Sequence, residues 1–224
     1  AAIRPLGRSL SSCQGKGLSD VKAKISSIGE AIETWRMETL TKSDYGKTVT
    51  AIDPQGREKK LLDPGILNDL ALDLRGVGSK ERVKYRNTNG VGSNWTTRAA
   101  MQHAFNEIVE RRSVELWKSR SPIQCFNRLI DIDKLKHENH RIQNLLHKFD
   151  EARVLVTLWD LKIEKCQPVV LCVIGDENPQ FIPQLAEGTG CSDSPIEAIE
   201  RAILEAAQSR LTIISGSRDD LTHK

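Results

Sequence analysis

Three stretches of the chain carry acidic or amide side chains three residues apart, in segments whose apolar residues keep a helical period. The pairs are Glu30 and Glu33, Glu107 and Glu110, and Glu205 and Gln208. Residues three positions apart lie on nearly the same face of a helix. If the three helices meet, five carboxylates and one amide line a common pocket, and cations must neutralise them. The pattern therefore predicts a divalent-metal site, most simply magnesium that bridges phosphates.

Glutamate pairs at this spacing also occur on ordinary solvated helices, so the neighbouring residues matter. Here apolar side chains crowd the same faces, for example Ile28 and Ile32 beside the first pair and Ile108 and Val109 beside the second. Carboxylates embedded in apolar helix are costly to bury unless a charge partner compensates them. This context favours the functional interpretation over the solvated one.

A glycine-flanked lysine precedes the first of these segments. Lys16 lies between Gly15 and Gly17. Glycine lets backbone N–H groups approach an anion, and lysine adds a positive charge, so this loop is a candidate for phosphate contact. It is not a Walker motif, which requires GxxxxGK followed by Ser or Thr. The Gly90–Gly92 and Gly188–Gly190 segments are each interpreted as a turn before a helix.

The elements that must position these residues are predicted to be both helices and strands. Helices are expected at 19–40, 66–74, 96–117, 137–150 and 194–210, and strands at 1–14, 85–92, 152–161, 168–175 and 211–215. Residues 183–192 are expected to form a loop, and Ser194 and Glu197 a capping box with Pro195 at the first helical position. The fold class is therefore mixed α/β (α+β) in one domain. The polar helices recur after glycine-rich loops, which indicates an internal structural repeat.

Composition limits the classes of function. Charged residues make up 28% of the 224 residues and the net charge is only +3, which gives no sign of nucleic-acid binding. No apolar run approaches the roughly 20 residues that span a bilayer, so no membrane partner is expected. The five cysteines are scattered without a CxxC pair, which favours a reducing, cytoplasmic location over a disulfide framework or zinc ribbon. His140 and His147 could share a helix face, but further metal ligands at suitable spacing are missing.

Three blocks of sequence resemble the ATP site of the YcaO family. They are RSLSSCQGKGLSDVKAKISSIGEAIE, RNTNGVGSNWTTRAAMQHAFNEIVERRSVELW and AEGTGCSDSPIEAIERAILEAAQSRLTIISGSRDDL. They occur in the family's order, with similar spacing. The sequence of the first block is most similar to that of family members that pair with a TfuA-type partner. These members are associated with thioamide formation. Family members usually continue beyond both ends of this sequence, so we expect a core truncated at both ends.

The resemblance implies a fold, a chemistry and a set of site residues. The fold is layered sheets and helices with ATP held between them, and the activity is ATP- and magnesium-dependent phosphorylation of a peptide or protein backbone amide oxygen. An attacking nucleophile then gives an azoline or a thioamide. The implied magnesium ligands are Glu30, Glu33, Glu107, Glu110 and Glu205. The implied ATP contacts are Lys16, Ser26, Asn94, Arg111 and Gln208. Thr34 and Arg112 depart from the family, where many members have Arg and Asp.

Several alternatives stay open. The chain could instead be a non-catalytic nucleotide-binding accessory protein that assists a separate modifying enzyme, such as a ribosomal-protein methylthiotransferase. Catalytic residues, the peptide substrate and the nucleophile are not identified by the sequence. The expected partners are a peptide or protein substrate and a TfuA-like protein, and a homodimer is kept as one alternative for the oligomeric state.

Overall fold

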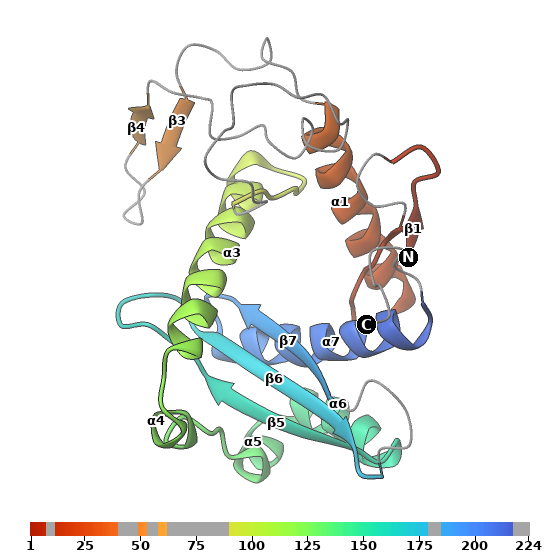
Figure 1. Ribbon diagram of the computed structural model, residues 1–224, viewed down its shortest axis with the longest axis vertical. Coiled ribbons are helices and arrows are strands. Elements are labelled where there is room, and N and C mark those ends of the chain that lie inside the picture. The colour runs from red at the N-terminus through yellow and green to blue at the C-terminus, as the bar shows by residue number, and fades with distance from the viewer. Residues whose placement is uncertain (8–11, 40–48, 53–57, 62–89, 179–184, 217–224) are drawn as a thin grey trace.

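The computed structural model contains a three-stranded antiparallel sheet with helices on both faces, in the lower half of the view in Figure 1. The sheet has the order β5 (Val154–Asp160), β6 (Val169–Asp176), β7 (Leu185–Cys191). The structure describes residues 1–7, 12–39, 49–52, 58–61, 90–178 and 185–216. The expected helix at 66–74 and most of the expected strand at 85–92 lie outside these ranges.

The central strand β6 shows why both faces of the sheet are covered. Its side chains point alternately to opposite faces. Val170, Cys172 and Ile174 join the core formed with α6 (His140–Glu151) and α7 (Pro195–Ile214). Val169 and Leu171 join a second core with Val109 of α3 (Thr97–Lys118). The result is three layers, with α3 on one face of the sheet and α6 and α7 on the other.

The remaining elements are shorter or lie away from this sheet. Two-residue strands β1 (Ala2–Ile3) and β2 (Ser12–Cys13) pair antiparallel beside α1 (Asp20–Thr39). The backbone of β3 (Val49–Ile52) pairs with that of β4 (Glu58–Leu61). Helices α4 (Pro122–Phe126) and α5 (Ile132–Glu138) connect α3 to α6. In the described part of the chain, no helix combines the length and apolar character needed to span a bilayer.

The sequence-based assignment of the mixed class and of the three polar helices is confirmed. The helices α1, α3 and α7 begin within one residue of the expected positions. Thr96 caps α3, with its side chain accepting a hydrogen bond from the Ala99 backbone N–H at 3.2 Å. The β5–β6 hairpin is also present as expected. That the chain forms a single domain stays a prediction.

Five local assignments were wrong. In place of the strand expected at 1–14, the described residues form only the two-residue strands β1 and β2, with a turn at residues 5 and 6. Residues 185–191 form strand β7 and not a loop, and α7 continues to Ile214, where a strand was expected from residue 211. The helix expected at 137–150 is broken at Asn139, which caps α6 through its side chain. The capping box at Ser194 is not formed, because Glu197 accepts its hydrogen bond from the Ser192 hydroxyl instead.

Candidate functional site

Each polar helix is anchored by a glycine that lies directly on its backbone. A Cβ atom added to Gly15, Gly92 or Gly190 would lie 2.1, 2.6 or 2.2 Å from the carbonyl oxygen of Ala23, Ala100 or Ala198, respectively. Only a residue without a side chain allows such an approach. In all three cases the contacted residue follows the glycine by eight positions. The three segments therefore share one packing arrangement, which supports the expected internal repeat.

The same repeat fixes the positions of the polar side chains. The glycines precede Glu30, Glu107 and Glu205 by fifteen residues, and Glu33, Glu110 and Gln208 by eighteen. The first acidic residue thus follows the anchoring alanine by seven positions, or about two helical turns, and shares its helix face. In each unit, contact between the segment that carries the glycine and the following helix therefore determines which helix face carries the acidic residues.

Helices α1, α3 and α7 surround one cavity of about 1300 Å³. Figure 1 shows the three helices on three sides of this region. The cavity is lined by every residue that the sequence assigned to the site: Lys16, Ser26, Glu30, Glu33, Asn94, Glu107, Glu110, Arg111, Glu205 and Gln208. The expected convergence of the three helices is therefore present. The roles of these residues as metal or nucleotide ligands stay predictions.

Several of the carboxylates already accept hydrogen bonds from the protein. Glu107 accepts from Arg111 Nη2 at 2.7 Å and from the Gly90 backbone N–H at 3.1 Å. Glu33 accepts from the Ser93 backbone N–H at 2.6 Å. Glu205 forms an ion pair with the Lys16 ammonium group. These partners hold the acidic side chains within the cavity.

Each repeated unit consists of one polar helix and the segment that precedes it. Two of these contacts, together with a third, close a ring between the three units. The loop before α1 supplies Lys16 to Glu205 of α7, and the loop before α3 supplies Ser93 to Glu33 of α1. The third contact comes from the strand before α7, where the Thr189 hydroxyl donates to Glu110 Oε1 of α3 at 2.8 Å. Each unit therefore holds an acidic side chain that belongs to another unit.

Glu110 has an unfavourable environment for a charged carboxylate. Burial raises the pKa of its carboxyl group above the ordinary value, and the nearby charge of Glu205 raises it further. The Thr189 hydrogen bond and the Lys16 charge oppose this by lowering the pKa. A carboxylate shielded from water and close to a second carboxylate is stabilised by any cation that reaches it. The electrostatics therefore favour a cation at this side of the cavity.

The carboxylates are suitable ligands for magnesium, but in this structure they do not surround a single ion-sized site. Carboxylate oxygens are hard ligands of the kind that magnesium prefers. Among the described residues, however, no three His, Cys, Asp or Glu side chains come close enough together to hold an ion. Lys16 already pairs with Glu205 Oε2, so a cation that binds this carboxylate would compete with the ammonium group. The residues thus fit a metal in type and charge, and their present protein contacts compete with it.

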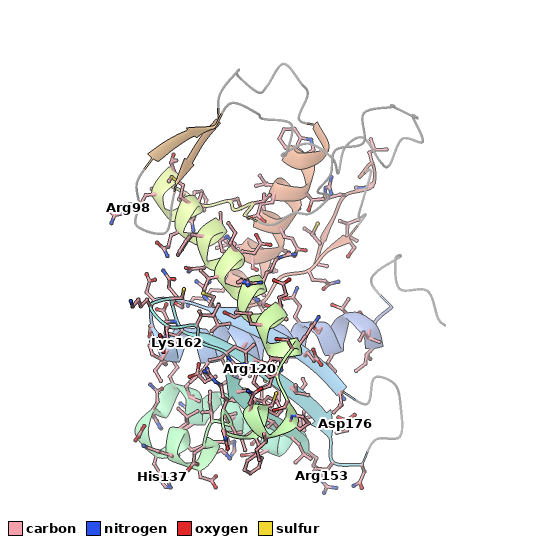
Figure 2. The ribbon with its side chains drawn as sticks, turned by 60° about the vertical axis from the view of Figure 1, so that its left-hand side comes forward. Arg98, Arg120, His137, Arg153, Lys162 and Asp176 are labelled. Carbon is pink, nitrogen blue, oxygen red and sulfur yellow. The ribbon has the colours of Figure 1, made fainter. Side chains whose placement is uncertain are left out.

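The histidines near residue 140 do not form a metal site. His140 contacts Gln143, and His147 lies 3.5 Å from Glu151 on the same helix. Figure 2 shows the neighbouring His137 at the end of the molecule opposite α1, far from the cavity. These contacts are those of solvated surface side chains.

The sequence did not identify several residues that line the cavity. Thr189 was missed because its segment was interpreted as a loop, and Ser93 because its contribution is a backbone N–H. Three isoleucines of α1, Ile25, Ile28 and Ile32, are each about half exposed and line an apolar wall of the cavity. Their helical spacing was visible in the sequence, but they were not assigned a role in the site.

Comparison with known proteins identifies a family. The family model described as YcaO cyclodehydratase, ATP- and Mg2+-binding, matches residues 70–224, which is more than half of the chain. This match contains the second and third polar helices. A protein from Rhizobium leguminosarum bv. trifolii, named as an uncharacterized protein in the tfuA 3' region, is 28% identical over 257 residues. That alignment covers 99% of this chain, including α1, and 60% of the relative.

Solved structures show the same fold. A heterocyclase in complex with substrate and cofactor superposes with a TM-score of 0.68 at 19% identity, over 93% of this chain and 33% of that one. YcaO from Methanopyrus kandleri, bound with AMPPCP and Mg2+, superposes with a TM-score of 0.60 at 18% identity, over 90% of this chain and 55% of that one. At such identities the likeness establishes the fold alone. The chain spans 55–63% of the length of the curated relatives that it matches.

Proposed function

The chain belongs to the YcaO family, and from this premise we propose that it is the nucleotide-binding core of an enzyme that activates a peptide backbone amide with ATP and magnesium. The observation that carries the proposal is the single cavity that all ten expected site residues line. Its volume exceeds the roughly 300–1,000 Å³ that is usual for small-molecule pockets. This volume leaves space for a nucleotide and a segment of peptide together.

The side chains around the cavity divide the task between them. Glu30, Glu33, Glu107, Glu110 and Glu205 would hold magnesium, which supplies charge neutralisation and alignment of the phosphates when it is bound. Lys16, Ser26, Asn94, Arg111 and Gln208 would contact the nucleotide. The backbone N–H of Lys16 is already directed by the Ser26 hydroxyl, which accepts from it at 3.3 Å. This bond holds the glycine-flanked loop against α1, so that the lysine side chain projects toward Glu205.

The proposed reaction uses phosphorylation to make an amide oxygen a good leaving group. The amide oxygen attacks the γ-phosphorus, and the bond to ADP breaks. A nucleophile then attacks the former carbonyl carbon, and phosphate departs with the amide oxygen. The cavity's main contribution is to hold the two reactants in line. The apolar wall formed by Ile25, Ile28 and Ile32 would lie against the peptide.

The nucleophile determines the product. An adjacent Cys, Ser or Thr side chain of the peptide gives an azoline, whereas an external sulfide gives a thioamide. The relative from the tfuA 3' region supports a TfuA-like partner protein for this chain. The thioamide product is favoured by the resemblance of the first sequence block to members that pair with such a partner.

Isotope transfer tests the proposal. Full-length protein is incubated with ATP and a cognate peptide whose backbone amides carry oxygen-18, and the released phosphate and the peptide are analysed by mass spectrometry. Phosphoryl transfer to the amide predicts label in the phosphate, with a peptide mass change of about +16 Da for a thioamide or about −18 Da for an azoline. Label that stays in a peptide of unchanged mass would contradict the proposal and favour the accessory nucleotide-binding protein.

A further inference from the structure

Thr189 lies on a closely packed part of the cavity wall. It lies on β7 between Gly188 and Gly190, and an added Cβ on either glycine would meet the backbone of α7 at 2.1 or 2.2 Å. Because side chains alternate along a strand, Thr189 points to the opposite face of the sheet, toward α3. The two glycines therefore lock the backbone of β7 on α7 and fix the direction of the Thr189 side chain.

Thr189 contacts Glu110, a carboxylate whose pKa is raised by burial. Its Oγ1 lies 2.8 Å from Glu110 Oε1, and both residues line the cavity. A hydroxyl that donates to a carboxylate stabilises its charged form and fixes its orientation. Glu110 is flanked by the like charges of Glu107 and Glu205, and both interactions disfavour its ionised state. The Thr189 hydroxyl opposes these charges from the sheet side.

We propose that Thr189 is a positioning residue, whose hydroxyl holds the Glu110 carboxylate in the orientation needed to bind the magnesium ion of the nucleotide site. The inference rests on the proposed function, because it requires Glu110 to be a magnesium ligand. Hydrogen-bond partners of metal ligands typically change metal affinity 10- to 100-fold when they are removed.

The ring of contacts between the repeated units supports this assignment. The equivalent contacts come from Lys16, a charged side chain, and from the backbone N–H of Ser93. Thr189 supplies a neutral hydroxyl, so its contribution can be removed without a change in charge or backbone. Valine has nearly the same shape and is equally favourable in a strand. Serine keeps the hydroxyl and removes the methyl group.

The test compares Thr189→Val and Thr189→Ser in the full-length protein, with Ser192→Ala as a matched control. Ser192 also donates to a glutamate, Glu197 Oε2 at 2.7 Å, but does not line the cavity. Calorimetry with a non-hydrolysable ATP analogue gives the magnesium concentration for half-maximal nucleotide binding. Titration with Mn2+ followed by electron paramagnetic resonance reports the bound ion directly. Circular dichroism and melting temperature verify the fold of each variant.

We expect Thr189→Val to raise the half-maximal magnesium concentration roughly tenfold, while Thr189→Ser and Ser192→Ala stay within about twofold of the wild type. A folded Thr189→Val protein with unchanged magnesium dependence would overturn the positioning role alone. Equal impairment of the serine and valine variants would also overturn it, since a variant that keeps the hydroxyl would then lose as much as one that lacks it. A wild-type protein without magnesium-dependent nucleotide binding would overturn both this inference and the proposed function.

Discussion

Replacement of Lys16 by methionine is expected to affect metal binding and nucleotide binding in opposite directions. The Lys16 ammonium group is the cation that neutralises Glu205, and its charge also lowers the pKa of Glu110. In the proposed function, Lys16 contacts phosphate once the nucleotide is bound. Without nucleotide, the same ammonium group competes with a divalent cation for Glu205.

The effect of Lys16 on divalent-cation affinity can be estimated from the solvent exposure of the Lys16–Glu205 ion pair. The side chains of Lys16 and Glu205 are 30% and 32% exposed, so solvent screens their attraction only in part. Ion pairs near a protein surface contribute up to about 1 kcal/mol. Since about 1.4 kcal/mol corresponds to a tenfold change in affinity, loss of the lysine charge should tighten nucleotide-free divalent-cation binding roughly fivefold. Affinity for the nucleotide should fall, because the phosphate loses a positive contact.

The assay is a Mn2+ titration followed by electron paramagnetic resonance, with and without a non-hydrolysable ATP analogue. Lys134→Met is the control, because Lys134 pairs with Glu138 on α5 and does not line the cavity. It should leave both affinities unchanged. If Lys16→Met weakens nucleotide-free Mn2+ binding or leaves it unaltered, Lys16 is not a competitor of the metal and the reasoning fails.

Three further predictions concern the fold and its electrostatics. Gly190→Ala should destabilise the protein by about 1–3 kcal/mol through overpacking on α7, whereas Gly29→Ala, whose Cβ would have its nearest neighbour at 3.4 Å, should not; denaturant unfolding measures both. Because the folded-state pKa of Glu110 is raised, its carboxyl stabilises the protein at low pH and loses this effect as the pH rises through that value. Glu110→Gln should therefore raise the melting temperature of the metal-free protein at pH 8, with a gain that disappears on acidification. Burial raises the pKa of Cys172 and Cys191 to about 12, so both thiols should resist alkylation at pH 8 until the protein is unfolded, as peptide mass spectrometry would show.

The long helices could be predicted because their signals are local. The helical period of the apolar residues and the cap at Thr96 depend on neighbours a few positions away, and tertiary packing did not override them. The segment after Gln208 shows the opposite case. Its β-branched residues favour a strand, yet α7 continues through it, and the buried Thr212 hydroxyl donates to the Gln208 carbonyl oxygen at 2.8 Å. Of residues 211–214 only Thr212 is buried, so the helix continues here mainly by propagation from the packed turns that precede it, which costs less than starting a new element.

Strand β7 could not be predicted for a related reason. Glycines such as Gly188 and Gly190 indicate a turn as readily as a close approach of two backbones. The distinction depends on α7, whose Ala202 and Ala206 leave space for the strand. Once 185–191 was interpreted as a loop, nothing placed the side chain of Thr189 opposite Glu110. The missing site residue is thus a direct consequence of the missing strand.

The acidic residues themselves were predictable because their spacing repeats from unit to unit, but the means of holding them together is not local. Within one unit, the glycine-containing segment lies against the anchoring alanine, two helical turns from the first acidic residue. In the three ring contacts, the donor that reaches each carboxylate comes from another unit: Lys16 for Glu205, Ser93 for Glu33 and Thr189 for Glu110. An isolated unit would leave these carboxylates to water. Only when the three units close around the cavity do the carboxylates gain their donors, so the same step of folding that buries the negative charge also supplies the groups that hold it in place.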